Sequence, residues 1–80
     1  MKPESLKILV SEINYKLGRI DHFKTMLEKS ENKQDDNYLK SQKRLAKLVE
    51  EATNLLQIMK LEELDNFNEY KEIFKKLNLF

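Results

Sequence analysis

Apolar residues recur at alternating steps of four and three along the first third of the chain. The seam consists of Leu6, Val10, Ile13, Leu17, Ile20 and Leu27, and Leu9, Phe23 and Met26 widen it. Only Lys24 interrupts the seam. This period is typical of an amphipathic helix that packs along one face. Because Pro3 suits the first turn of a helix, the pattern predicts a helix over residues 3–29.

Residues 30–37 are all polar and rich in turn formers, which predicts a loop. We expect Asp35 or Asp36 to cap the next helix by accepting a backbone N–H of its first turn. The apolar rhythm then resumes over residues 38–63, at Tyr38, Ser41, Leu45, Leu48, Ala52, Leu55 and Met59. Two long helices joined by a short polar loop predict an antiparallel helical hairpin.

After Met59 the apolar positions lose their phase. Asn66, followed three residues later by Glu69, matches the pattern of a capping box. We therefore expect a third, shorter helix over residues 67–79. Its packing face, together with the residue that follows it, carries Phe67, Tyr70, Phe74 and Phe80. The competing interpretation is a second helix that runs unbroken to the end. The predicted fold class is all-α, with the hairpin and the C-terminal helix in one domain spanning residues 1–80.

The chain has 80 residues, and a domain this small buries only about 60% of the surface that its unfolded chain exposes. The predicted third helix covers about half the length of the hairpin. Either it folds back to complete a three-helix bundle, or two hairpins pair into a four-helix bundle. Because half of the hairpin's apolar face would stay exposed in a monomer, the sequence favours a homodimer. The predicted dimer or bundle core consists of Leu6, Val10, Ile13, Leu17, Ile20, Leu27, Leu45, Leu48, Ala52, Leu55, Met59, Phe67 and Phe74.

Charges are balanced overall but unevenly placed. Fifteen Lys and Arg against fourteen Asp and Glu leave a net charge of +1. Residues 38–49 hold no acid but contain the basic cluster Lys40, Lys43, Arg44 and Lys47, whereas residues 50–65 are mainly acidic. Each hairpin is thus basic toward its loop and acidic toward its open end, so antiparallel pairing lays basic on acidic. The basic cluster is either a contact for phosphate or an acidic partner, or a solvated face.

A second candidate surface lies on the first helix, away from the seam. Ile8, Tyr15 and His22 are spaced seven residues apart, with Gly18 and Arg19 between the last two. An apolar and aromatic line beside an arginine has the composition of a protein-binding hot spot. The alternatives are that the third helix packs there or that these are isolated surface residues. Gly18 indicates either a close approach of another backbone or a slight kink.

Several classes of chemistry lack their residues. With no Cys and one His, the chain has no disulfide framework, no thiol chemistry and no ordinary zinc site. The longest apolar run is three residues, so we expect neither a membrane span nor a signal peptide. His22 has no nucleophile within reach on its own helix, and the acidic pairs Glu50–Glu51 and Glu62–Glu63 project on diverging faces. We expect a protein that is not an enzyme, with no cofactor, metal or small-molecule substrate.

These observations predict a cytoplasmic, homodimeric module that binds a larger protein as an adaptor, regulator or inhibitor. One rival is a small dimeric nucleic-acid-associated regulator that uses the basic cluster on phosphates. Another is a structural or assembly subunit that docks through its aromatic C-terminal helix. The Lys-, Asn- and Ile-rich, Gly-poor composition fits an AT-rich coding source, such as a low-GC bacterium, its phage or plasmid, or a protozoan.

Overall fold

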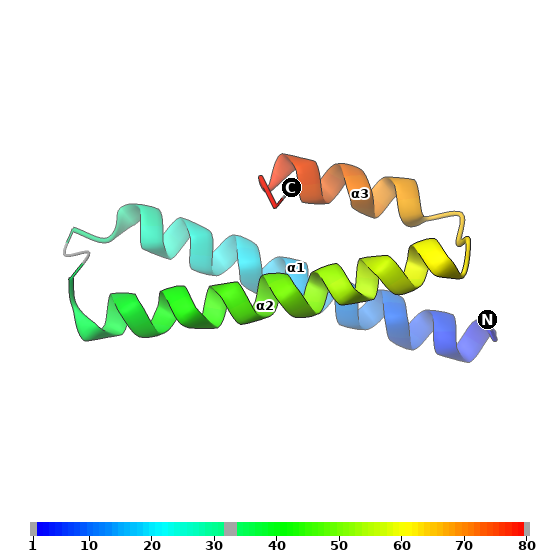
Figure 1. The fold of residues 1–80 in the computed structure, drawn as a ribbon, viewed down its shortest axis with the longest axis horizontal. Coiled ribbons are helices and arrows are strands. Elements are labelled where there is room, and N and C mark those ends of the chain that lie inside the picture. Colours follow the sequence, from blue (N-terminus) through cyan, green and yellow to red (C-terminus); the bar gives the residue numbers. More distant parts are fainter. Residues whose placement is uncertain (1, 32–33, 80) are drawn as a thin grey trace.

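The computed structural model describes residues 2–31 and 34–79. Asn32 and Lys33 of the predicted loop, and the aromatic Phe80, lie outside the described residues. Within these ranges the chain forms three α-helices and no strand: α1 (Pro3–Lys29), α2 (Asp36–Leu61) and α3 (Phe67–Lys76). α1 and α2 pack as an antiparallel hairpin, and α3 folds back over the half of the hairpin that lies away from the α1–α2 loop (Figure 1). The all-α hairpin with a short third helix is thus confirmed, and an unbroken second helix is excluded.

The first turns of the three helices differ in their capping. α1 starts at Pro3, as its pattern predicts. α2 starts two residues before its predicted boundary because Asp35 is the N-cap. Its side chain accepts the backbone N–H of Asn37 at 2.9 Å. α3 starts at the predicted residue, but the side chain of its N-cap, Asn66, makes no capping hydrogen bond. The predicted capping box is therefore wrong.

α2 and α3 end in the same way, earlier than the predicted boundaries at 63 and 79. Beyond α2, Glu63 takes a positive φ of 52°, and the N–H of Leu64 returns to the carbonyl of Met59. Beyond α3, Asn78 takes a φ of 57°, and the N–H of Leu79 returns to Phe74. Both ends are Schellman motifs, which usually use glycine at the positive-φ position. Neither position holds glycine, so the sequence lacks the commonest stop signal at both ends, although asparagine also occurs at this position.

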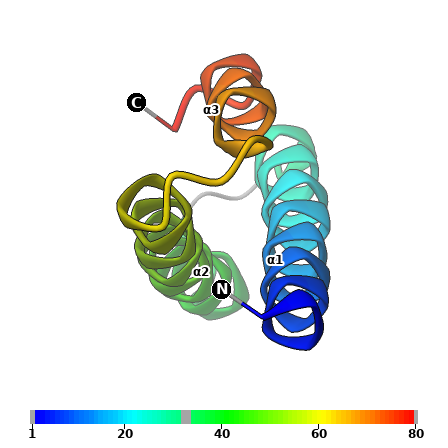
Figure 2. The ribbon, with the colours of Figure 1, turned by 90° about the vertical axis from the view of Figure 1, so that its right-hand side faces the viewer.

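α1 has two neighbours, so its apolar stripe is wider than a single seam. Viewed end-on, the three helices occupy the corners of a triangle (Figure 2). Lys16 of α1 reaches α2 through Glu51. Asn14 of α1 accepts a hydrogen bond from the hydroxyl of Tyr70 in α3. A helix that contacts two others needs residues on both sides of the predicted seam.

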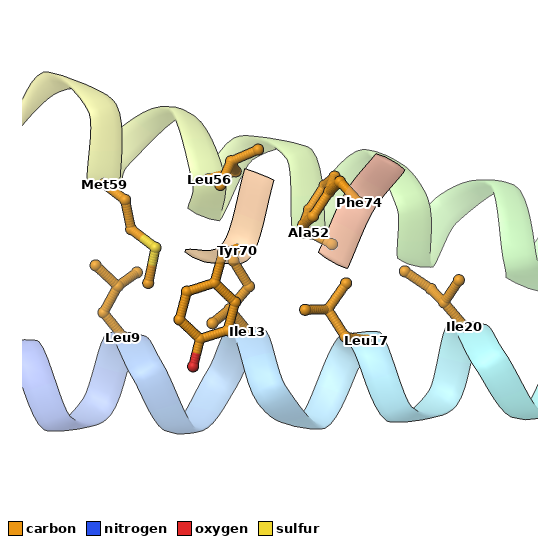
Figure 3. Close-up of a cluster of buried hydrophobic side chains, with 9 residues drawn as sticks. All are labelled: Leu9, Ile13, Leu17, Ile20, Ala52, Leu56, Met59, Tyr70 and Phe74. Carbon is orange, nitrogen blue, oxygen red and sulfur yellow. The ribbon is translucent and has the colours of Figure 1, made fainter. Parts of the chain in front are cut away.

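The core is the cluster shown in Figure 3, where side chains from all three helices meet. Seven predicted core residues are buried: Ile13, Leu17, Ile20, Leu27, Ala52, Met59 and Phe74. Leu9, Phe23, Leu56 and Tyr70 are also buried, although the predicted core omits them. The predicted members Val10, Leu45, Leu48, Leu55 and Phe67 are only partly buried against this cluster. Leu6 is wrong as a core residue: it is half-exposed and lies at a shallow hollow near the α2–α3 turn. The difference arises because α1 packs on α2 and on α3 from different sides, so its buried stripe is wider than the single predicted seam.

Candidate functional site

α3 closes one face of the hairpin and leaves the opposite face uncovered. On the covered side, α3 contacts Asn14 and Lys24 of α1 and lies beside Thr53 and Gln57 of α2. Tyr15 is rotated by about 100° from Asn14 around α1, away from α3. We call the uncovered side the open face. Among the described residues, no helix packs on the open face as α3 packs on the covered side.

A shallow groove of about 230 Å³ runs between α1 and α2 on the open face. Its lining comes from both helices: Tyr15, Arg19, Arg44, Lys47, Leu48 and Glu51. The groove thus combines three cationic groups with one aromatic ring, one leucine and one carboxylate. In the sequence, Tyr15 and Arg19 belong to one candidate surface and Arg44 and Lys47 to another. The fold brings these four residues together.

The single carboxylate of the groove is engaged by a lysine from α1. Lys16 Nζ lies 2.9 Å from Glu51 Oε2, and the Lys16 side chain is only 16% exposed. The hydrogen bond from Lys16 lowers the pKa of Glu51 below its ordinary value, and the same bond raises the pKa of Lys16. Because Glu51 is paired with Lys16, it leaves Arg19, Arg44 and Lys47 as the groove's excess positive charge.

Arg19 is held in place by an aromatic ring. Its guanidinium carbon lies 5.0 Å from the centroid of the Phe23 ring, a cation–π contact. The ring of His22 lies edge to face with the Phe23 ring, at 5.8 Å between centroids. Among the described residues, no carboxylate forms a salt bridge with Arg19, Arg44 or Lys47. Arg19, Arg44 and Lys47 are therefore available for contact with acidic groups.

Apolar side chains extend the open face in both directions from the groove. Residues seven apart lie two turns away on nearly the same side of a helix. Ile8 and Met26 stand in this relation to Tyr15 and Arg19, and Leu55 and Ile58 to Leu48 and Glu51. Ile8 is 66% and Tyr15 63% exposed. Of the six exposed large hydrophobic residues in the described ranges, four lie on the open face: Ile8, Tyr15, Met26 and Ile58.

The two predicted candidate surfaces fare differently in the fold. Ile8, Tyr15 and His22 are exposed and Arg19 is half-buried, all on the side of α1 away from α3. The alternative that the third helix packs on this line is therefore wrong. Lys40, Lys43, Arg44 and Lys47 are all exposed, but only Arg44 and Lys47 line the groove. The basic cluster is thus divided between the groove and the outer surface of α2.

Four polar residues with tertiary contacts are absent from the predicted sites: Asn14, Lys16, Lys24 and Glu51. The lysine that interrupts the α1 seam donates a hydrogen bond to the carbonyl of Leu77, where α3 ends. A positive charge at a helix C-terminus is favourable. A lysine inside an apolar stripe thus indicates a polar contact with another element. This signal could have predicted the tertiary role of Lys24.

Gly18 has no close neighbour in the described chain. A Cβ added there would meet nothing within 4 Å. A close approach of another backbone, one of the two explanations for Gly18, is therefore not found among the described residues.

The aromatic segment packs within the molecule. Tyr70 and Phe74 are buried against the hairpin, and Phe67 is partly buried.

Over the described residues, no group of three or more His, Asp or Glu side chains could hold a metal ion. No helix in the same ranges has the length and apolarity needed to cross a membrane.

The chain matches no protein-family model, no curated protein and no solved structure at a significant level of similarity. Its function is therefore inferred from the geometry of the open face.

Proposed function

We propose that this chain is a cytoplasmic protein-interaction module without enzymatic activity. It forms a homodimer through the open face, and the dimer acts as an adaptor, regulator or inhibitor of a larger protein. The observation that carries the proposal is the groove, where Tyr15 and Leu48 lie beside Arg19, Arg44 and Lys47. Aromatic and arginine side chains are enriched at the energetic centres of protein interfaces.

The composition of the groove specifies the kind of segment it binds. Its aromatic and leucine side chains favour an apolar contact, and its three cations favour carboxylates. A helix fits this surface best, because the groove runs between two helices and its apolar extensions recur at a two-turn spacing. The preferred partner segment is therefore an amphipathic helix with acidic residues beside its apolar stripe.

Site-specific photo-crosslinking in cells of the native organism tests this proposal. Tyr15 is replaced with benzoylphenylalanine, and the matched control carries the same residue at Lys43, which is exposed but lies outside the groove. We expect protein adducts at position 15, formed with a second copy or another protein, and few at position 43. Equal labelling at both positions, or no protein adduct at position 15, would contradict the proposal.

The rival function is binding to a nucleic acid through the basic cluster. It is supported by the exposure of Lys40, Lys43, Arg44 and Lys47 along α2. Binding led by phosphate contacts weakens steeply with salt. Binding of duplex DNA at low salt, lost in Lys40→Glu and Lys43→Glu but kept in Tyr15→Ala, would favour this rival. We expect no such binding, as measured by fluorescence anisotropy across a salt series.

A further inference from the structure

We infer that the open face binds the open face of a second copy of this chain, with the two hairpins antiparallel, so that Arg19 of each copy meets Glu12 of the other. This inference rests on the proposed function, because it names the partner of the same face and the geometry of the contact. Its first support is the exposed apolar stripe of Ile8, Tyr15 and Met26 on α1. A two-helix face with such a stripe on one side forms half of a four-helix core.

Charge along the open face sets the orientation. Toward the α1–α2 loop the face carries Arg19, Arg44 and Lys47. Toward the other end, α1 presents Glu12 and Glu4, of which Glu12 lies seven residues before Arg19 and therefore on nearly the same side of the helix. Two copies aligned in parallel would place cations on cations. Two antiparallel copies instead place Arg19 of each copy on Glu12 of the other, and such complementarity selects the register and orientation of an interface.

A single two-fold axis is consistent with the residue spacing on both α1 and α2. On α1, Arg19 and Glu12 are symmetric about a point between Tyr15 and Lys16. On α2, Leu48 and Leu55 are symmetric about a point next to Glu51. The ion pair between Lys16 and Glu51 shows that these two points lie side by side across the hairpin.

The same axis therefore brings Arg19 to Glu12 and Leu48 to Leu55 of the second copy, with the two Tyr15 rings near the centre. This arrangement is isologous, the commonest form of a homodimer interface. The contact buries the exposed apolar stripe of α1 and pairs Arg19 of each copy with Glu12 of the other across the interface.

Charge reversal and charge exchange test the inference. The mass of the full chain is measured by light scattering and sedimentation from micromolar to millimolar concentration. We expect twice 9.6 kDa for the unaltered chain. Arg19→Glu and Glu12→Arg should each raise the dissociation constant of the dimer about tenfold or more, since symmetry places two like-charge contacts in each dimer. Arg19→Glu combined with Glu12→Arg should restore dimerisation, because each contact then joins the same two charges in exchanged positions.

Matched controls separate the interface from the fold. Lys43→Glu and Glu50→Arg change the same charges at exposed positions outside the groove and should leave the dissociation constant unchanged. Circular dichroism should show equal helix content in every variant. A dimer that Arg19→Glu and Glu12→Arg leave intact, or that the combined variant fails to restore, would overturn the inference while the proposed homodimer stands. A chain of 9.6 kDa at every concentration would overturn both, and protein adducts at position 15 would then preserve the interaction function alone.

Discussion

The two faces of the hairpin use the same residue types for opposite purposes. On the covered face, α3 buries Tyr70 and Phe74 against Leu17 and Ala52, and the Tyr70 hydroxyl donates a hydrogen bond to Asn14. On the open face, Tyr15 is 63% exposed beside cations without a salt-bridge partner among the described residues. An aromatic residue therefore stabilises the fold on one face and remains available for contact on the other.

The difference follows from the number of helices. Two helices have two open faces, and one short third helix can cover only one of them. A protein of this size has a small stability margin, since globular domains gain roughly 0.05–0.15 kcal/mol per residue. The covered face supplies that margin, whereas the open face retains apolar area that a second molecule can bury.

The largest expected contrast comes from removing one aromatic side chain on each face. Phe74→Ala should cost about 3–5 kcal/mol of unfolding free energy, because the side chain is fully buried. Tyr15→Ala, measured at concentrations where the chain is monomeric, should cost less than about 1 kcal/mol. Urea unfolding followed by circular dichroism measures both. Phe74→Leu gives a milder variant if the alanine variant does not fold, and equal losses at the two positions would contradict the contrast.

A smaller effect concerns the polar contact between α1 and α3. The hydroxyl of Tyr70 lies 2.7 Å from Asn14 Oδ1. Tyr70→Phe should therefore lower the unfolding free energy by about 1 kcal/mol. Asn14→Ala should cost a similar amount, and the two together little more than either alone. Additive losses in this double-mutant cycle would show that the bond does not hold α3 on the covered face.

A substitution at Gly18 should raise the unfolding free energy, whereas the substitutions above lower it. Since a Cβ there meets nothing, Gly18→Ala should stabilise the monomer by about 0.5–1 kcal/mol through the helix propensity of alanine. Ala46→Gly, at an exposed position of α2, is the control and should destabilise by a similar amount. Thermal unfolding measures both. A destabilising Gly18→Ala would mean that another backbone approaches α1 at this point.

The smallest effect is the pH dependence of the ion pair beneath the groove. Hydrogen bonding to Lys16 lowers the folded-state pKa of Glu51 below its ordinary value of 4.5. The contribution of Glu51 is therefore present above its unfolded-state pKa and lost as pH falls through the folded-state pKa. Glu51→Gln should be less stable than the unaltered chain near neutral pH, and this difference should disappear in acid. Glu50→Gln, which changes an exposed neighbour, should show no such dependence.

The high-pH limit of the same pair is set by Lys16. Its hydrogen bond to Glu51 raises the pKa of Lys16 above 10.5, so the contribution of the pair should persist until the pH rises through that raised value. A difference between the unaltered chain and Glu51→Gln that does not change with pH would contradict the assigned pairing.

Much of the hairpin follows from local chemistry. The seam from Val10 to Leu27, the turn residues after Ser30 and the cap at Asp35 act over a few residues, so the periodicity predicts α1 and the beginning of α2 to within two residues. The C-terminal ends of α2 and α3 were harder to predict, because Glu63 and Asn78 adopt the conformation that glycine usually provides.

The candidate site was predictable residue by residue but not as an assembly. The seven-residue spacing of Ile8, Tyr15 and His22 is enough to mark one side of α1. Periodicity within a helix cannot show that Arg44 and Lys47 lie beside Tyr15, because that proximity depends on how α1 and α2 are aligned, as seen in the pair Lys16–Glu51.

Helix formation, the hairpin and the outward stripe of α1 are encoded by residues three to seven positions apart, because these spacings set which side chains share a helix face. The choice of the face that α3 covers involves contacts between residues more than fifty positions apart, such as Tyr70 with Asn14 and Lys24 with Leu77. These contacts depend on the complete packing of three helices. That packing leaves Tyr15, Arg19, Arg44 and Lys47 together on the side that remains uncovered.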